Sequence, residues 1–410
     1  MWIRALFVCL GLSICAYSAS AQDRPAIEKQ FRLWLEQEIW PRARSAQVSR
    51  QVFESAFDGV TLDWNLPDLV PPGSAAQSQE TQHQAEFGAP ARYFRRSVLD
   101  EASKTGRLMA QRHADILARI EAKTGVPGRI ILGIWGRESA YGRARIRHDA
   151  FRVLGTKGFM STRAPYFTDE LIDALRMLEG GTARSTMRSS WAGALGQPQF
   201  MPSSFLEHAT DGDGDGRADI WTSQEDTLAS IARYLAHHDW QAGRDWGFEV
   251  NLPPGVSCTL EGPDQGRKIK DWAALGITRI FGKPFPAHEL DGMGYLMMPA
   301  GRKGPAFIVT PNFYVLKDYN MSDLYALFVG HMGDRIQYGM GDFRGAWRDV
   351  SGLRRSDVVK IQRALEGMGH DVGGADGLAG YKTRRSIGRW QEATNRPATC
   401  FPKAGMASEF

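Results

Sequence analysis

The sequence predicts a mainly helical protein of the α+β class, with minor strand content and a small helical domain at the C-terminal end. Apolar residues recur at helical spacing through most of the first 240 residues. Short β-branched and aromatic runs appear only between residues 250 and 315, and the composition becomes Gly-rich after residue 338. The 410 residues, 43% of them hydrophobic, are ample for a large core.

The N-terminus has the pattern of a secretory signal. Arg4 supplies a positive charge, residues 5–16 are nearly all apolar, and Ala19-Ser20-Ala21 offers a cleavage site. Roughly a dozen apolar residues are too few to span a bilayer. We expect residues 1–21 to be removed, which takes Arg4 away and changes the formal charge from +4 to +3 (+4 − 1). A lipid anchor on Cys15 is disfavoured by the bulky residue before it.

Charge and cysteine content narrow the possible classes of protein. The net charge is small, and no Lys/Arg run is interleaved with aromatic residues, so we expect no nucleic-acid partner. The 12 Trp and 11 Tyr could line a carbohydrate groove, although the core is the commoner place for them. Once the signal is removed, Cys258 and Cys400 remain, and a disulfide and two free thiols are equally compatible with their wide separation.

Helical periodicity and turn residues divide the first part of the chain. Thr168 is the expected N-cap of one helix, and Gly142 is the expected end of another. A polar stretch, residues 68–90, reads as a loop or an extended segment. Helices are predicted at residues 28–57, 93–122, 128–141, 168–179 and 225–240.

The remaining third of the chain has a different pattern. The runs AFIVT (306–310) and FYVL (313–316) are predicted as strands. Residues 338–351 read as a linker. Residues 352–410 then form a small three-helix domain, in which Val358, Ile361 and Leu365 make one apolar stripe and Ile387 and Trp390 belong to a second.

One carboxylate stands out. A helix here places Ile131, Trp135 and Glu138 on one face, so the carboxyl group emerges at the end of an apolar stripe. Desolvation should raise its pKa. A glutamate that is protonated near neutral pH is what general acid catalysis requires. The alternative is a partly exposed ion pair with Arg137 or Arg143.

The motifs ESAYG (138–142) and SSWAGALGQPQFMPSSF (189–205) resemble the lytic murein transglycosylases of the B type. In that family, E-S/T-x-x-G ends the helix that supplies a single catalytic acid, and S-x-A-G-A-x-G-x-x-Q-F-x-P-S lines the sugar cleft. DGDGDGRADIW, SIARYLAHHDW and DYNMSDLYALFVGHMGDRI follow in the family's order, so the resemblance covers residues 25–337. Gln197-Pro198 departs from the pattern, and we expect Pro198 to reshape a subsite.

The resemblance implies a lysozyme-like catalytic domain over residues 25–337, located in the periplasm and acting on peptidoglycan glycan strands. It implies that Glu138 protonates the oxygen between N-acetylmuramic acid (MurNAc) and N-acetylglucosamine (GlcNAc). Glu138 then acts as base on the muramic C6 hydroxyl, which gives a 1,6-anhydro end. A water-using muramidase and a non-catalytic wall-binding scaffold are the alternatives. The implied substrate contacts are Ser190, Gln199, Tyr234, Tyr319, Asn320 and Tyr325; for Tyr319 and Tyr325, core packing is the alternative.

The stretch that begins DGDGDG opens like a calcium loop of the EF-hand kind. Thr222 stands where the closing glutamate of such a loop belongs. The resemblance implies a longer loop closed by a later acid, Glu225, with Asp226 as the alternative. We expect a structural Ca²⁺ and no organic cofactor. The expected ligands are Asp211, Asp213, Asp215, the Arg217 carbonyl and Glu225.

Residues 352–410 resemble the peptidoglycan-binding domain type 1, with its L-Q-x-x-L helix, its G-x-D-G-x-x-G turn and its T-x-x-A-I-x-x-F-Q helix. Ser386 stands where Ala is frequent, and Trp390 where Phe is frequent. The resemblance implies wall binding, which would raise the local substrate concentration. A stabilising appendix without a ligand is the alternative. Other wall-synthesis or division proteins as partners cannot be read from the sequence.

Overall fold

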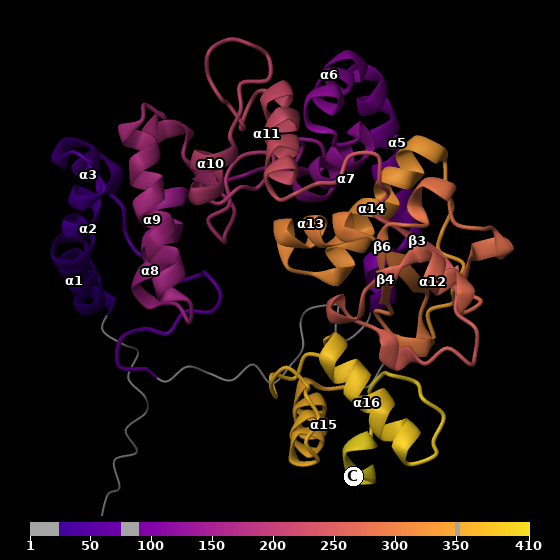
Figure 1. The fold of residues 1–410 in the computed structure, drawn as a ribbon. Coiled ribbons are helices and arrows are strands. Elements are labelled where there is room, and N and C mark those ends of the chain that lie inside the picture. The colour runs from indigo at the N-terminus through magenta and orange to yellow at the C-terminus, as the bar shows by residue number, and fades with distance from the viewer. Residues whose placement is uncertain (1–23, 75–89, 349–352) are drawn as a thin grey trace, which may run out of the picture. The chain divides into compact units, whose positions relative to one another are not determined.

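The computed structural model describes residues 24–74, 90–348 and 353–410 (Figure 1). The predicted signal, residues 1–21, therefore lies outside the described residues. None of the described helices is both long and apolar enough to cross a membrane. The described chain divides into two compact units, which are taken in turn below.

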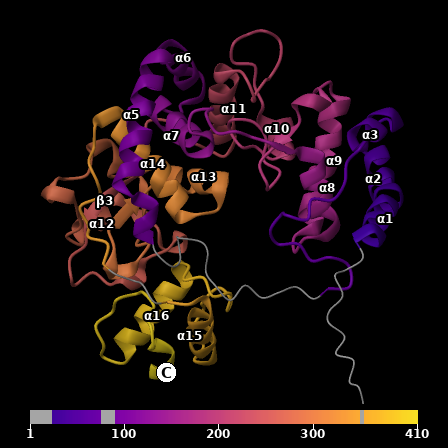
Figure 2. The same ribbon diagram turned by 180° about the vertical axis from the view of Figure 1, so that it is seen from behind.

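The first unit combines residues 24–74 with residues 151–184. Aromatic rings join its two segments: Phe57 meets Phe151 edge-on at 5.8 Å, and Phe31 meets Phe159 at 5.6 Å. Segments distant in sequence therefore share one core, with their helices side by side in Figures 1 and 2. The helices are α1 (Arg24–Trp34), a π-helical turn η1 (Leu35–Ile39), α2 (Trp40–Ser45), α3 (Arg50–Phe57), α8 (Ala150–Met160) and α9 (Ala164–Glu179).

Two helix boundaries differ from the sequence-based expectation in this unit. The predicted helix 28–57 is interrupted between Ser45 and Arg50. Thr168 is not an N-cap: α9 begins at Ala164, and the Thr168 hydroxyl donates a hydrogen bond to the Ala164 carbonyl inside the helix, 2.9 Å away. The earlier start follows from the proline in the first turn, where its missing N–H costs nothing.

Helix α7 lies at the centre of the helices of the second unit and packs against α5, α6, α11 and α14. Its contact with α14 is close, because a Cβ atom on Gly133 would lie only 2.7 Å from the Val329 carbonyl oxygen. These helices are α5 (Arg96–Arg112), α6 (Ala114–Thr124), α7 (Gly128–Ser139), α10 (Pro202–His208), α11 (Gln224–His237), α12 (Ile269–Ala274), α13 (Pro311–Asn320) and α14 (Asp323–Tyr338).

A five-stranded antiparallel sheet, ordered β4-β6-β7-β3-β5, packs within the same unit. Val309 on β7 lies opposite Gly247 on one side and Tyr295 on the other. The strands are β3 (Gly247–Asn251), β4 (Arg267–Lys268), β5 (Thr278–Arg279), β6 (Met293–Met297) and β7 (Ala306–Val309), with a separate pair β1 (His148–Asp149) and β2 (Arg188–Ser189). Single turns of 3-10 helix are η2 (Pro90–Phe94), η3 (Arg184–Thr186), η4 (Cys258–Leu260), η5 (Pro263–Gln265), η6 (Ile280–Gly282), η7 (Ala287–Glu289) and η8 (Gly301–Lys303).

The strand predicted at AFIVT is confirmed as β7, whereas the strand predicted at FYVL is wrong. Residues 313–316 lie inside α13, which begins at Pro311 behind the Thr310 N-cap. The side chain of Thr310 accepts a hydrogen bond from the Asn312 backbone N–H and so starts the helix. Capping and the proline outweigh the strand preference of the aromatic and β-branched residues.

The C-terminal segment contains α15 (Arg355–Gly367), α16 (Tyr381–Ala393) and a final 3-10 turn, η9 (Met406–Glu409). The third predicted helix is therefore only this short turn. The core of the C-terminal segment is formed by Ile361, Leu365, Ile387 and Trp390, together with neighbouring apolar residues. The apolar stripes predicted for the small domain are thus confirmed.

This segment is fastened to the sheet region of the second unit. A disulfide joins Cys258 to Cys400, which settles the alternative that the sequence left open. Beside it, the buried side chains of Arg384 and Glu261 form an ion pair, with Arg384 Nε 3.1 Å from Glu261 Oε2. The second compact unit includes residues 353–410, and the predicted linker and domain boundaries stay predictions.

Candidate active site

Glu138 lies at the penultimate position of α7. The helix ends directly after it because Ala140, Tyr141 and Gly142 all have left-handed backbone, with φ angles of 50°, 61° and 76°. Ile131 and Trp135 on the same face are fully buried, as the predicted apolar stripe requires. The chain thus presents the carboxyl group at the end of a largely buried helix.

The carboxyl group of Glu138 has few polar neighbours. Its Oε1 atom is enclosed and makes no hydrogen bond to any described residue. Burial raises the pKa of Glu138 to about 7, and this effect outweighs the lowering by the Tyr325 hydroxyl and by the Arg137 guanidinium. The Tyr325 hydroxyl has no partner with good hydrogen-bond geometry, yet it is close enough to Glu138 to be the larger of the two lowering effects. Near neutral pH, Glu138 is therefore poised between its acid and base forms.

Aromatic rings form one wall beside this carboxyl group. The rings of Tyr319 and Tyr325 are nearly parallel, 6.2 Å apart, and Tyr234 meets Tyr319 edge-on at 4.8 Å. Proximity to the Glu138 charge raises the pKa of both Tyr319 and Tyr325, after the larger effect of burial. Two of the tyrosines predicted for the sugar cleft, Tyr319 and Tyr325, thus lie near Glu138, and Tyr234 packs against Tyr319. Tyr325 is only 1% exposed, so core packing is part of its role.

Hydrogen bonds hold two of these tyrosines in place. The Tyr319 hydroxyl donates to the Pro198 carbonyl over 2.7 Å, and the Tyr234 hydroxyl donates to the Asp318 carbonyl over 2.9 Å. The first bond connects α13 to the loop 189–205. The wall and the loop are therefore one connected structure.

The loop 189–205 uses its polar side chains to hold its own shape. Ser190 Oγ accepts hydrogen bonds from the backbone N–H groups of Ala194 and Ala192, at 3.2 and 3.4 Å. Gln199 has a left-handed backbone, and its side-chain amide donates to the Gly196 carbonyl at 2.8 Å. Asn320, the last residue of α13, is exposed. Contacts of Ser190, Gln199 and Asn320 with sugar stay predictions.

Gln197 is a site residue that sequence reasoning missed. Its Oε1 accepts a hydrogen bond from the Trp135 indole N–H at 2.9 Å, and its amide donates to the Trp221 carbonyl at 3.1 Å. A Cβ atom on Gly142 would lie 2.4 Å from Gln197 Oε1, so only glycine leaves room for this side chain. The available signal was Trp135 itself, because a buried indole N–H needs an acceptor.

Three acidic side chains of the predicted calcium loop approach one another: Asp211, Asp213 and Asp226 each have a carboxylate oxygen within 4.8 Å of the others. Asp226 is 1% exposed and accepts hydrogen bonds from the backbone N–H groups of Gly212 and Asp219 at 2.8 and 2.6 Å. Burial, helped by the Asp213 charge, raises the pKa of Asp226. A cation bound here would stabilise the ionised form of Asp226, which burial and the Asp213 charge disfavour.

The other predicted ligands lie elsewhere in or beside the loop. Glu225 Oε1 is 3.5 Å from His113 Nδ1 and is not part of the acidic group. Asp226, the alternative closing acid, lies in the acidic group in the first turn of α11, and the choice between Glu225 and Asp226 as a ligand stays a prediction. Asp215 is exposed and accepts a hydrogen bond from the Arg217 backbone N–H at 2.8 Å.

Comparison with known proteins agrees with this arrangement. Residues 30–334 match the family described as the Transglycosylase SLT domain. The chain is 31% identical over 256 residues to the membrane-bound lytic murein transglycosylase B of Escherichia coli K12, covering 61% of this chain and 68% of that one.

Solved structures are similar over a larger share of the chain. SltB3 from Pseudomonas aeruginosa, in complex with NAG-anhNAM-pentapeptide, is 34% identical with a TM-score of 0.82, and the match covers 92% of this chain and 98% of SltB3. The Escherichia coli lytic transglycosylase Slt35 in complex with calcium is 25% identical with a TM-score of 0.54, covering 77% and 94%.

These relatives are lytic transglycosylases with a lysozyme-like fold, and the mainly helical fold class predicted from the sequence is confirmed. This chain belongs to the Transglycosylase SLT domain family.

Proposed function

We propose that the protein is a lytic murein transglycosylase that cleaves the β-1,4 bond between MurNAc and GlcNAc in peptidoglycan glycan strands. Glu138 is its single catalytic carboxyl group, and the products carry 1,6-anhydroMurNAc ends. The observation that carries this proposal is the enclosed carboxyl group of Glu138, whose pKa burial raises to about 7. Similar structures, 34% identical, contain NAG-anhNAM-pentapeptide and NAG-NAM-pentapeptide.

In the first step, protonated Glu138 gives its proton to the bridging oxygen as the bond to the muramic C1 breaks. Most glycosidases use a second carboxylate at this stage. None of the charges that shift the pKa of Glu138 is a carboxylate. We infer that the sugar's own C6 hydroxyl, and not a second carboxylate, attacks C1 as positive charge develops there.

In the second step, the same glutamate, now ionised, takes the proton from the C6 hydroxyl as its oxygen bonds to C1. The attacking oxygen and C1 belong to one molecule, so proximity replaces an external nucleophile. The reaction consumes no water, and Glu138 ends in its starting protonated form. The wall of Tyr234, Tyr319 and Tyr325 offers flat faces for sugar rings, as is common for aromatic side chains at binding sites.

The test is mass spectrometry of the soluble products from purified peptidoglycan. Wild type should release muropeptides with 1,6-anhydro ends, and Glu138→Gln should release at least about 10²-fold less, because general acid catalysis is lost. Glu101→Gln, an exposed glutamate on α5, is the matched control and should behave as wild type. Reducing ends would instead indicate a muramidase, and wall binding without products would indicate a scaffold.

We also propose a structural Ca²⁺ in the acidic loop. Carboxylate and carbonyl oxygens are the ligands that Ca²⁺ prefers. Asp211, Asp213 and Asp226 fit this donor type, and buried Asp226 is the acid that gains most from a cation. Bound Ca²⁺ would offset two of the three negative charges, while the chain's own backbone N–H groups orient the three carboxylates.

For the C-terminal segment we propose wall binding. Gln362 is fully buried and organises the predicted turn: its amide donates to Asp376 Oδ1 at 3.0 Å, and its carbonyl accepts from the Gly377 N–H at 2.7 Å. A pocket of about 340 Å³ opens beside this turn, lined in part by Tyr381 and Lys382. A pull-down of the full chain with insoluble peptidoglycan, compared with Tyr381→Ala, tests this. We propose export to the periplasm through residues 1–21.

A further inference from the structure

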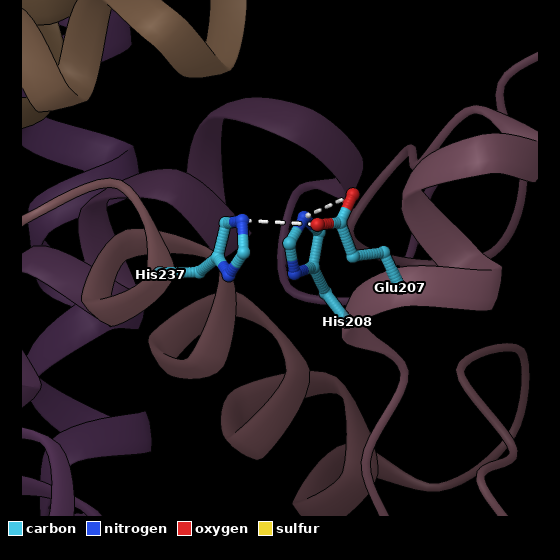
Figure 3. A group of neighbouring side chains, drawn as sticks. All are labelled: Glu207, His208 and His237. Carbon is cyan, nitrogen blue, oxygen red and sulfur yellow. Dashed lines mark ion pairs between the residues drawn. The ribbon is translucent and has the colours of Figure 1, made fainter.

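A second cluster of titratable side chains, two histidines and a glutamate, lies between α10 and α11 (Figure 3). Glu207 and His208 end α10, and His237 ends α11. His237 Nε2 lies 2.9 Å from Glu207 Oε1, and His208 Nε2 lies 3.6 Å from Glu207 Oε2. Both imidazoles thus direct a nitrogen toward one carboxylate.

The three side chains have the composition and spacing of a transition-metal site. One ligand atom from each lies within 4.8 Å of the others. Around one tetrahedral Zn²⁺, with bonds of about 2.0–2.2 Å, ligand atoms are about 3.3 Å apart. Glu207 and His237 are about half exposed, so their side chains can close the remaining distance. His208 is 2% exposed and supplies the fixed ligand.

We propose that Glu207, His208 and His237 bind a divalent transition-metal ion, with Zn²⁺ as the preferred species. Two imidazoles and one carboxylate suit Zn²⁺ better than Ca²⁺ or Mg²⁺, which take oxygen ligands. Three protein ligands leave a fourth position for water or an outside donor. The site is separate from Glu138 and from the acidic loop.

Burial prepares the central ligand. His208 is almost fully buried, which favours the neutral ring, the form in which imidazole binds metals. His208 Nδ1 is enclosed and has no hydrogen-bond partner among the described residues. Metal-bound histidines usually donate their second N–H to an acceptor, and the absence of one lowers affinity about 10–100-fold. We therefore expect binding in the micromolar range.

Metal binding at this cluster would affect the wall of tyrosines near Glu138 (Tyr234, Tyr319 and Tyr325), because His208 contacts Tyr234. His208 packs edge-on against Tyr234 at 4.9 Å, and Tyr234 packs against Tyr319 at 4.8 Å. A metal that joins the last residues of α10 and α11 would fix His208 behind Tyr234. The ion would thus stiffen one side of the proposed sugar site without touching substrate.

The experiment is calorimetric titration of Zn²⁺ into the mature full-length chain, prepared without a polyhistidine tag and in millimolar Ca²⁺ to keep Zn²⁺ from the acidic loop. Wild type should bind one Zn²⁺ per chain with a Kd on the order of 1–10 µM, and His237→Gln should weaken binding at least about tenfold. His238→Gln is the matched control, because His238 neighbours His237 but lies outside the cluster, and it should bind as wild type.

A second probe reports the ligands directly. Co²⁺ in the wild-type protein should show the intense visible absorption of a tetrahedral site, and Glu207→Gln should lose it while its circular dichroism is unchanged. Equal Zn²⁺ affinity in His237→Gln and wild type would overturn the proposal. So would the absence of saturable Zn²⁺ binding to the wild type.

Discussion

The Trp135 indole N–H donates a hydrogen bond to the side-chain oxygen of Gln197, 2.9 Å away, and both side chains are buried. Trp135 lies one turn before Glu138 on α7, whereas Gln197 belongs to the loop 189–205. The bond therefore aligns the helix that carries the acid with the loop that faces it.

The variant Gln197→Met tests how much this hydrogen bond contributes to stability and to turnover. Methionine has a similar size but cannot accept from the indole, and an unsatisfied buried donor costs about 1–3 kcal/mol. We expect a lower melting temperature and a reduced kcat on peptidoglycan. Gln111→Met, at an exposed position on α5, is the control. A Gln197→Met protein with wild-type stability and turnover would contradict the proposed alignment.

The pKa of Glu138 predicts a pH profile for activity. The first step needs the protonated acid, so kcat/KM should fall as pH rises through about 7. The falling part of the pH–activity curve can be measured as the release of soluble muropeptides at several pH values and constant ionic strength. Tyr325→Phe removes a group that lowers this pKa, so this part of its curve should move to higher pH. A shift to lower pH would contradict the assignment.

The same carboxyl group affects stability. Its pKa is 4.5 when exposed and about 7 in the folded protein, so the folded state binds more protons between these values. Its contribution to stability is therefore fully present below pH 4.5 and is lost as pH rises through 7. Glu138→Gln should raise the melting temperature at pH 8 by a few degrees but leave it nearly unchanged at pH 4. Differential scanning calorimetry of this variant and Glu101→Gln at both pH values makes the comparison.

The acidic loop gives a prediction about calcium. Ca²⁺ should raise the melting temperature of wild type, and chelation should reverse the rise. Asp226→Asn should abolish the calcium-dependent shift, because Asp226 lies in the acidic group. Glu225→Gln should keep it, because Glu225 lies beside His113. The reverse pattern would restore Glu225 as the closing ligand.

The ion pair between Arg384 and Glu261 should be sensitive to loss of one partner. Arg384→Met leaves the fully buried Glu261 without its cation and should cost about 3–5 kcal/mol in chemical unfolding. Adding Glu261→Gln should recover most of this loss, since no buried charge then remains. Arg389→Met, exposed on the same helix, should be nearly neutral. An additive double variant would show that the pair is not coupled.

Local patterns predicted the central helix well. The apolar stripe to Glu138 was sufficient, because it depends on residues within one helix, although the helix ends at Ser139 with Ala140 as its cap and not at Gly142. Long-range contacts were not predictable in this way. The acceptor of the Trp135 indole lies 62 residues away, and Cys258 meets Cys400 across 142 residues. Periodicity carries no information about such pairs.

One wrong prediction and one open choice have local causes. The run FYVL favours a strand by composition, but the Thr310 cap and Pro311 begin a helix before it. Glu225 and Asp226 are adjacent, and their position in the first turn of α11 decides which of them faces the loop. Spacing alone could not distinguish them.

The first compact unit has a consequence for biosynthesis. Its N-terminal helices bury Phe31, Ile39 and Phe53, and α9, against which α2 and α3 pack, ends only at Glu179. At a translation rate of roughly 5–20 residues per second, α9 is synthesised on the order of 10 s after α2 and α3. During that interval their apolar faces are open to aggregation or to a chaperone. Slower synthesis between residues 60 and 150 would lengthen the exposure, so codon choice in that interval should influence the yield of folded protein.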